Sequence, residues 1–271
     1  MKRIIFTSML LFVLNSSGDA QNSQKKEDKY KWGCAIVINS TGPQINEPEW
    51  NSWGYAKGNF FNYGDIKNKS ISLSLIPKYH ISNDKLIRLE LGLTKVNLQS
   101  KVDSYFESSV KPPPSSHTVI NQSIKQNILR FIPGIEWTFL NKSKIKSYCG
   151  LSLAYLNYGN MSYHDLYEIR KLDGDTLQVS IDDNMVAPGG FATGAGAFAG
   201  FNIGIIKNVS IGAEFSSLLL YYKLGGGFKG EVITIDVPKP PANETYSTNS
   251  SSFKGVQFTH VISSFNVLFS F

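Results

Sequence analysis

Apolar and polar side chains alternate from one residue to the next along much of this sequence. Between residues 71 and 80, the odd positions are apolar or aromatic and most of the even positions are polar. The same alternation returns in seven further segments, which are residues 32–38, 87–94, 129–139, 149–155, 195–205, 209–221 and 261–271. A period of two over a run of residues is typical of a β-strand with one apolar face. The pattern therefore predicts eight strands.

The connections between these segments alternate in length. Three are tight polar turns of about 3–5 residues, and the other four run to about 25–35 residues, far longer than connections in compact soluble domains. The long ones lie near residues 39–68, 99–123, 157–191 and 223–255. Short turns at one end and long loops at the other are typical of transmembrane barrels. We therefore expect an all-β fold, an eight-stranded antiparallel up-and-down transmembrane β-barrel with long extracellular loops, in which the first strand pairs with the last.

The position of the charges indicates which face of each strand points to lipid. The non-apolar face is rich in glycine, serine, threonine and asparagine, and a lone charge facing lipid costs about 2–4 kcal/mol at mid-depth. An eight-stranded barrel has an interior just wide enough for side chains to fill. Cations and carboxylates at similar depth would then pair across the lumen. The predicted lumen network is Lys78, Arg88, Glu90, Arg130, Glu136, Lys146 and Glu214.

This network has two interpretations, a plug that fills the bore or a gated ion path, and the pairing of both charge signs favours the plug. A secreted soluble β-sandwich or a lipocalin-like barrel is the alternative fold. A lipocalin-like barrel would invert the pattern and place the apolar face inside.

The N-terminus has the features of a secretory signal. A short basic start is followed by an apolar stretch from Ile4 to Leu14 and by small residues up to Ala20. This predicts a signal peptide over residues 1–20 that is cleaved after Ala20. Residues 21–30 are polar and are expected to form a short periplasmic arm, and residues 31–271 the barrel domain.

The composition excludes several classes of ligand and cofactor. The 271 residues carry a formal net charge of +6, but the basic residues are scattered, which argues against nucleic-acid binding. The two cysteines, Cys34 and Cys149, fall on strands expected to lie on opposite walls, so we expect both to be free thiols. No Cys/His grouping has the spacing of a metal site, and we expect no metal and no cofactor.

The last residues carry a family resemblance. Phe265, Val267, Phe269 and Phe271 are apolar at every second position up to a terminal aromatic residue. This segment resembles the terminal strand of Gram-negative outer-membrane β-barrel proteins, and the chain as a whole resembles the small barrels of the OmpA/OmpX type. The resemblance implies that these four residues are an assembly signal for the barrel-assembly machinery, that outer-membrane lipid surrounds the barrel, and that the protein resides in the cell outer membrane.

The long loops are the expected working surface, because loops on a rigid scaffold commonly carry function. The first is rich in aromatic residues, namely Trp50, Trp53, Tyr55, Phe60, Phe61 and Tyr63. These residues would bind a glycan or a partner, or pack on one another as a cap. The partner itself is not identified by the sequence.

Enzymatic alternatives find little support. Outer-membrane lipid hydrolases carry a His-x-Ser pair, whereas Ser263 lies three residues after His260. An omptin-like protease would need acidic and His-Asp pairs at the rim, and the available pairs, His164-Asp165 and Asp182-Asp183, both fall in one loop. We therefore expect a non-enzymatic envelope or surface-interaction protein. A narrow porin-like channel for ions or small solutes is the alternative, and a membrane-embedded lipid hydrolase is third.

Overall fold

The computed structural model describes residues 32–39, 66–82, 84–106, 116–142, 144–171, 177–248, 252–259 and 262–271. Every helix or strand assigned within these residues is a β-strand. Among them, no helix is long and apolar enough to cross a membrane. The expected signal peptide and periplasmic arm, residues 1–30, lie outside the described part of the chain.

The described residues form fourteen strands in one antiparallel sheet. Their bounds are β1 Trp32–Asn39, β2 Ile66–Asn68, β3 Ile71–His80, β4 Lys85–Phe106, β5 Ser116–Lys142, β6 Ile145–Tyr158, β7 Met161–Lys171, β8 Leu177–Ala187, β9 Gly190–Ile206, β10 Val209–Leu224, β11 Phe228–Asp236, β12 Ala242–Thr248, β13 Phe253–Phe258 and β14 Ile262–Ser270. The expected number of eight strands is therefore too low for the sheet as a whole.

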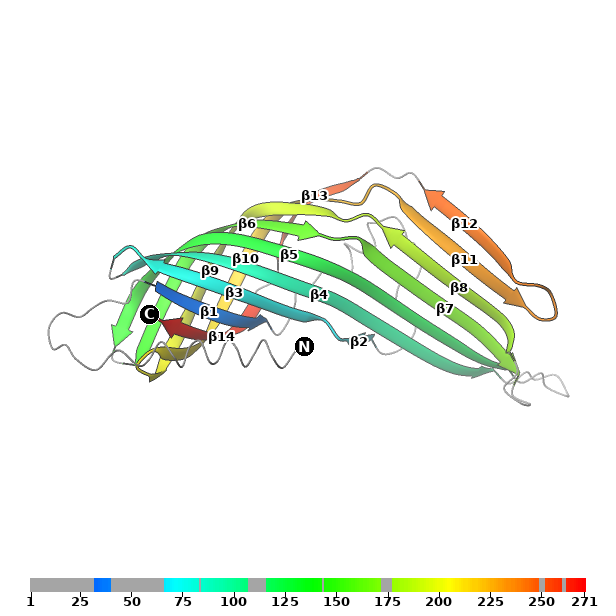
Figure 1. The fold of residues 1–271 in the computed structure, drawn as a ribbon, viewed down its shortest axis with the longest axis horizontal. Helices are drawn as coiled ribbons and strands as arrows, with labels where there is room; N and C mark the ends of the chain where they lie inside the picture. The colour runs from blue at the N-terminus through cyan, green and yellow to red at the C-terminus, as the bar shows by residue number, and fades with distance from the viewer. Residues whose placement is uncertain are drawn as a thin grey trace. The chain divides into compact units, whose positions relative to one another are not determined.

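Eight of the fourteen strands pair in a closed circuit, which we call the ring. Its order is β1, β3, β4, β5, β6, β9, β10 and β14, and β14 pairs with β1 to complete it (Figure 1). These are the eight strands that the alternation predicts, in sequence order, and the pairing of the first with the last is confirmed. The space that the ring encloses is called the lumen below.

The short turns gather at one end of the ring, where backbone hydrogen bonds connect neighbouring strands. Thr138 N donates to Asp84 O at 2.8 Å, and Gly204 N donates to Lys144 O at 2.7 Å. The last residue also takes part, since Phe271 N donates to Trp32 O at 2.9 Å. The bonds satisfy backbone groups at the strand ends, and the last of them extends the β14–β1 closure to the C-terminus.

At the other end the sheet continues beyond the ring, in strands that the sequence analysis took for loops. β4 and β5 stay paired from Lys85↔Trp137 to Phe106↔Ser116, so the connection expected over residues 99–123 is largely a hairpin. β5 pairs with β6 through one half of its length and with β7 through the other. β7, β8, β11 and β12 then follow in order, and we call them the extension (Figure 1).

Most of these additional strands were assigned to loops from the sequence because charged residues interrupt their apolar faces, as Asp165 does in β7 and Asp183 does in β8. Within residues 157–191, β7 and β8 form a hairpin that pairs with β5 and does not enter the ring.

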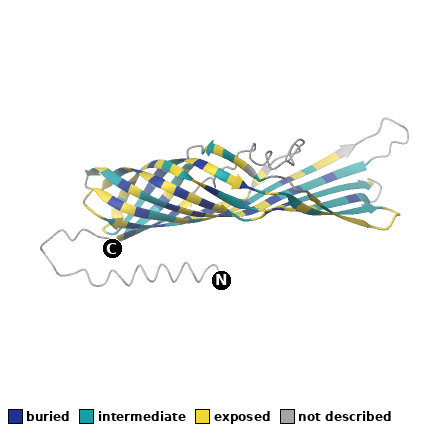
Figure 2. Cartoon of the chain, turned by 90° about the horizontal axis from the view of Figure 1, so that it is seen from above, coloured by how far each residue is buried: buried dark blue, intermediate teal, exposed yellow. Residues whose placement is uncertain are grey.

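Exposure follows the predicted alternation around the ring. In β6 the burial pattern alternates strictly, with apolar side chains such as Leu151 and Leu153 exposed and Ser152 and Ala154 buried. Figure 2 shows the resulting chequered pattern of buried and exposed residues. Because the outward side chains are leucine, isoleucine and phenylalanine over several strands, the outer surface is apolar to an extent that marks a membrane or partner surface.

The lumen itself has two layers. Towards the short turns it is filled by charged side chains, which the next section describes. Towards the extension the inward positions are apolar and form one cluster that includes Ile128, Ile132, Leu156, Leu218 and Leu220. The sequence predicts polar residues at the inward positions throughout the lumen, and this second, apolar layer corrects that prediction.

Candidate functional site: a charged network in the lumen

The charges of the lumen come from four strands of the ring. Lys78 lies on β3, Arg88 and Glu90 on β4, Arg130 and Glu136 on β5, and Glu214 on β10. All six occupy inward positions. Five are buried, with at most 7% of the residue exposed, and Glu90 is half-buried. The structure therefore brings together six of the seven residues predicted for this network.

Arg88 and Glu214 form the strongest pair. The Arg88 guanidinium donates two hydrogen bonds to the carboxylate, from Nη1 to Oε2 at 2.6 Å and from Nη2 to Oε1 at 2.9 Å. Tyr148 adds a third bond, since its hydroxyl donates to Glu214 Oε2 at 3.0 Å. A bidentate arginine–carboxylate pair fixes both side chains in one orientation.

A second pair lies beside the first. Lys78 Nζ donates to Glu136 Oε2 at 2.7 Å, and Arg88 Nη1 is 3.6 Å from the same oxygen. Arg88 therefore lies between two carboxylates and connects the two pairs. Each of these buried charges therefore has a partner of opposite sign. An unpaired charge away from water would cost several kcal/mol.

Arg130 forms a third contact, nearer to the apolar layer. Its Nη2 donates to Ser72 Oγ at 2.9 Å and to Ser74 Oγ at 2.6 Å, and it is 3.4 Å from Glu90 Oε1. Gly92 makes this approach possible. A Cβ at residue 92 would lie 2.7 Å from Arg130 Nε and 2.7 Å from Ser74 Oγ.

Two aromatic rings that the sequence analysis did not select complete the layer. The Arg88 guanidinium lies 4.1 Å from the centre of the Phe198 ring, and Lys78 Nζ lies 4.8 Å from that of Tyr148. Each ring faces a glycine on the neighbouring strand, Tyr148 facing Gly200 and Phe198 facing Gly150. An aromatic residue opposite a glycine, both at inward positions, is the signal that would have identified them.

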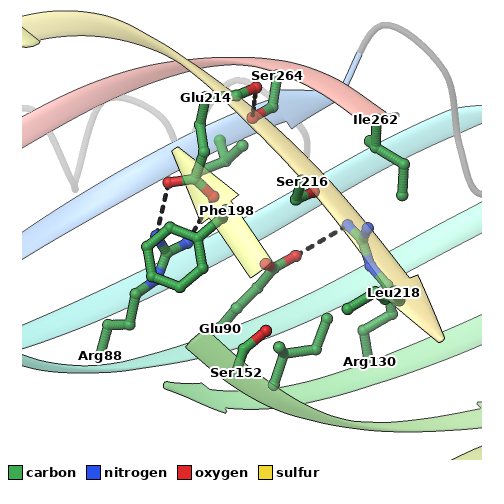
Figure 3. A pocket seen from close by; sticks show the side chains of 12 residues that line it. Arg88, Glu90, Arg130, Ser152, Phe198, Glu214, Ser216, Leu218, Ile262 and Ser264 are labelled. Carbon is green, nitrogen blue, oxygen red and sulfur yellow. Dashed lines mark hydrogen bonds and ion pairs between the residues drawn. The ribbon is translucent and has the colours of Figure 1, made fainter. Parts of the chain in front are cut away.

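A small cavity remains beside these charges. It is lined by Arg88, Glu90, Arg130 and Glu214 together with apolar residues that include Leu218 and Ile262 (Figure 3). Its volume is about 30 Å³. One water centre needs about 10–15 Å³ by this measure, so the cavity holds a few water molecules and no larger solute.

Lys146 does not join the network, and its prediction is wrong. The residue of β6 directly opposite Glu136 is Gly150, whereas Lys146 pairs with Asn141 near the turn. Lys146 therefore lies closer to the end of the strand and is exposed. Counting residues from the turn did not give the depth of Lys146 in the barrel correctly, because tilted strands are staggered relative to one another.

The terminal-strand residues lie in the closing strand of the ring. Val267 pairs with Ile36 of β1 and with Ile211 of β10, and Phe265 and Phe271 are exposed. Phe269 pairs with Cys34 and Val209. Their role in assembly stays a prediction. The loop aromatics Trp50, Trp53, Tyr55, Phe60, Phe61 and Tyr63 lie outside the described residues.

Both thiols are free, as expected. Cys34 is on β1 and Cys149 is on β6, which are four places apart in the ring of eight. In the described part of the chain, no three His, Cys, Asp or Glu side chains are grouped so as to hold a metal ion.

Comparison with known proteins gives structural similarity only. No protein-family model matches the sequence, and no curated protein matches it. The outer membrane protein OprG from Pseudomonas aeruginosa is 11% identical with a TM-score of 0.35, covering 88% of this chain and 96% of that chain. CarO from Acinetobacter baumannii is 12% identical with a TM-score of 0.30, covering 88% and 97%. The outer membrane protease OmpT from Escherichia coli is 9% identical with a TM-score of 0.30, covering 93% and 99%.

The resemblance to Gram-negative outer-membrane β-barrels is drawn from the sequence, and the narrower OmpA/OmpX type stays a prediction. The TM-scores lie below 0.5, so the fold described here rests on the strand pairings alone.

Proposed function

We propose that this chain is an outer-membrane β-barrel with a closed lumen, and that it acts as a non-enzymatic surface-interaction protein through the end that carries the extension. The observation that carries the closed lumen is the Arg88–Glu214 pair. β4 and β10 are four places apart in the ring, so this contact crosses the lumen from one wall to the opposite one.

Membrane insertion is supported by the outer surface of the ring. Phe139, Leu153 and Ile71 are each more than 60% exposed, and they point away from the lumen on three different strands. Burying such side chains in lipid removes apolar area from water at about 25 cal/mol per Å². A soluble lipocalin-like barrel would place its apolar residues in the calyx and not on the outer surface.

A surface role is supported by the extension. β7, β8, β11 and β12 form a sheet joined to β5, so this end offers an ordered platform. Binding residues on a rigid scaffold lose little conformational entropy when a partner binds.

Surface exposure of this end is testable with an epitope tag. A tag inserted between Asp173 and Gly174, in the connection between β7 and β8, is expected to bind antibody on intact cells. A tag inserted after Asn208, in the turn between β9 and β10, is the matched control and should bind only after the cells are opened. Labelling of the control on intact cells, with the Asp173 tag protected, would reverse the proposed orientation.

A narrow channel is the second candidate, and the water-sized cavity beside Glu90 and Arg130 favours it. Single-channel conductance in a planar bilayer separates the two functions. The closed lumen predicts conductance near zero for the unmodified chain and a measurable increase in Arg88→Ala and in Glu136→Ala. Arg170→Ala, on the extension, is the control. Steady conductance of the unmodified chain, with only ion selectivity altered by these substitutions, would favour the channel.

A lipid hydrolase is the third candidate, and no observation in the described residues favours it. His260 lies outside those residues. Incubation of the purified protein with outer-membrane lipids should release no fatty acid above a heat-inactivated control.

A further inference from the structure

The extension carries two carboxylates at directly opposed positions. Asp165 of β7 pairs with Asp183 of β8, so both side chains point to the same face of the sheet. Opposed side chains have Cβ atoms about 4.5–5.5 Å apart, and like charges at this separation destabilise a sheet. The arrangement therefore requires a positive charge or hydrogen-bond donors that offset the repulsion between the two carboxylates.

No basic side chain of the neighbouring sheet positions does so. The same row across the sheet continues through Gln122 and Ser100 on one side and through Val232 and Glu244 on the other. Among the described residues, the next row on either side that faces the same way, two residues along each strand from β4 to β12, contains no lysine, arginine or histidine. Asp182 and its partner His164, 3.0 Å apart, belong to the opposite face.

The hydrogen bonds at this site leave acceptor oxygens without donors. Asp165 Oδ2 accepts from the Tyr163 hydroxyl at 3.0 Å and from Gln122 Nε2 at 3.3 Å, and Asp183 Oδ1 accepts from the Tyr246 hydroxyl at 2.6 Å. Asp165 Oδ1 and Gln122 Oε1 are both buried and have no hydrogen-bond partner.

Gln122 provides an observation that is independent of the acidic pair. Its side chain is directed into the cluster by the bond to Asp165, and only 7% of the residue is exposed. An amide oxygen buried to this degree has lost its water and costs free energy unless a donor or a cation meets it. Both unmet atoms are acceptors, so a positive charge satisfies them and also relieves the carboxylate repulsion.

We infer that Asp165, Asp183 and Gln122 form a binding site for a hard divalent cation, Ca²⁺ or Mg²⁺. Carboxylate and amide oxygens are the ligands that these ions prefer, and Ca²⁺ accepts irregular sets completed by water. With only two carboxylates the site is weak, in the range of about 0.1–1 mM that is typical of extracellular calcium modules. Ca²⁺ is expected to bind more tightly than Mg²⁺, which demands near-ideal octahedral geometry. The inference is independent of whether the lumen conducts.

Titration calorimetry on the full-length protein in detergent, first treated with a chelator, tests this site. CaCl₂ and MgCl₂ are the probes. Asp165→Asn and Asp183→Asn keep the size of the side chain and an oxygen that accepts from tyrosine, and each is expected to weaken Ca²⁺ binding at least tenfold. Asp182→Asn is the matched control, since it removes the adjacent charge from the other face, and it should change the affinity by no more than about twofold.

Hydrogen exchange provides the second measurement, and it also shows whether each variant is still folded. Millimolar Ca²⁺ should slow exchange in β7 and β8 of the unmodified protein but not of Asp183→Asn, while exchange in the ring stays the same in both. The inference is overturned if the unmodified protein binds neither ion below 10 mM, or if Asp182→Asn loses as much affinity as the other two variants.

Discussion

Arg88 and Glu214 are 126 residues apart in the sequence and meet through two side-chain hydrogen bonds across the lumen. Their strands are diametrically opposed in the ring of eight. The pair therefore ties two walls together and at the same time fills the space between them. Stability and closure of the lumen should consequently change together when either residue is replaced.

Removal of the guanidinium is expected to destabilise the protein. Arg88→Ala leaves Glu214 buried without its cation and weakens the contact with Glu136, and breaking a buried pair in this way typically costs about 3–5 kcal/mol. The midpoint of urea unfolding in detergent should fall accordingly. Arg170→Ala is the comparison, because its partner Glu168 lies on the part-exposed surface of the extension. An equal effect of both variants would contradict a special role for the lumen pair.

A single methyl group at residue 92 should disturb the Arg130 site. The new Cβ of Gly92→Ala would lie 2.7 Å from both Arg130 Nε and Ser74 Oγ, so the guanidinium has to move and its serine bonds weaken. Crowding of this kind costs about 1–3 kcal/mol. Gly204→Ala is a suitable control, since the nearest neighbour of its Cβ would be Lys144 O at 3.7 Å. Thermal unfolding should show a lower midpoint for the first variant and little change for the second.

The two thiols should not form a disulfide even under oxidising conditions. Cys34 and Cys149 lie on opposite walls, whereas a disulfide needs Cα atoms closer than about 7 Å. Intact-mass measurement of the oxidised, purified chain should show two reactive thiols. A mass lower by two hydrogen atoms, with a disulfide-linked Cys34–Cys149 peptide after digestion, would falsify the strand order.

Deletion of Phe271 should impair assembly. Its backbone N–H continues the β14–β1 closure at Trp32, and the resemblance to outer-membrane barrels implies that the terminal aromatic is part of the assembly signal. The truncated chain is expected to be degraded or to remain in the periplasm, which fractionation and heat-modifiable gel mobility detect. Normal insertion of the truncated chain would argue against this role.

The metal-free extension should lose stability as the pH rises from the acid range. Burial raises the pKa of Asp183 above its ordinary value near 3.8. The charges of Asp165 and Asp182 raise it further, and the Tyr246 hydrogen bond and the charge of His164 act in the opposite direction. A raised pKa in the folded state means that the stabilisation is present below about pH 3.8 and is lost as the pH passes the folded value. Hydrogen-exchange protection of β8, measured with a chelator present, should fall over this range. In Asp183→Asn it should not.

The sequence by itself determined the eight strands of the ring and the direction of nearly every side chain in them. The reason is that successive residues of a strand point to opposite faces, so the alternation that identifies a strand also assigns its inward residues. Lys78, Arg88 and Glu214 were placed in the lumen on this basis alone. Their inward direction follows from the local backbone geometry, whereas their burial, which Lys146 lacks, depends on how deep in the ring each one lies.

Tertiary structure decided which of these residues meet. Strand stagger put Gly150 and not Lys146 opposite Glu136, and ring closure put Glu214 within reach of Arg88. Pairing register likewise set Asp165 against Asp183, which interrupt the apolar faces of β7 and β8. Contacts across the lumen and between strands depend on how many strands close the ring and how far each is shifted, and these are properties of the whole sheet.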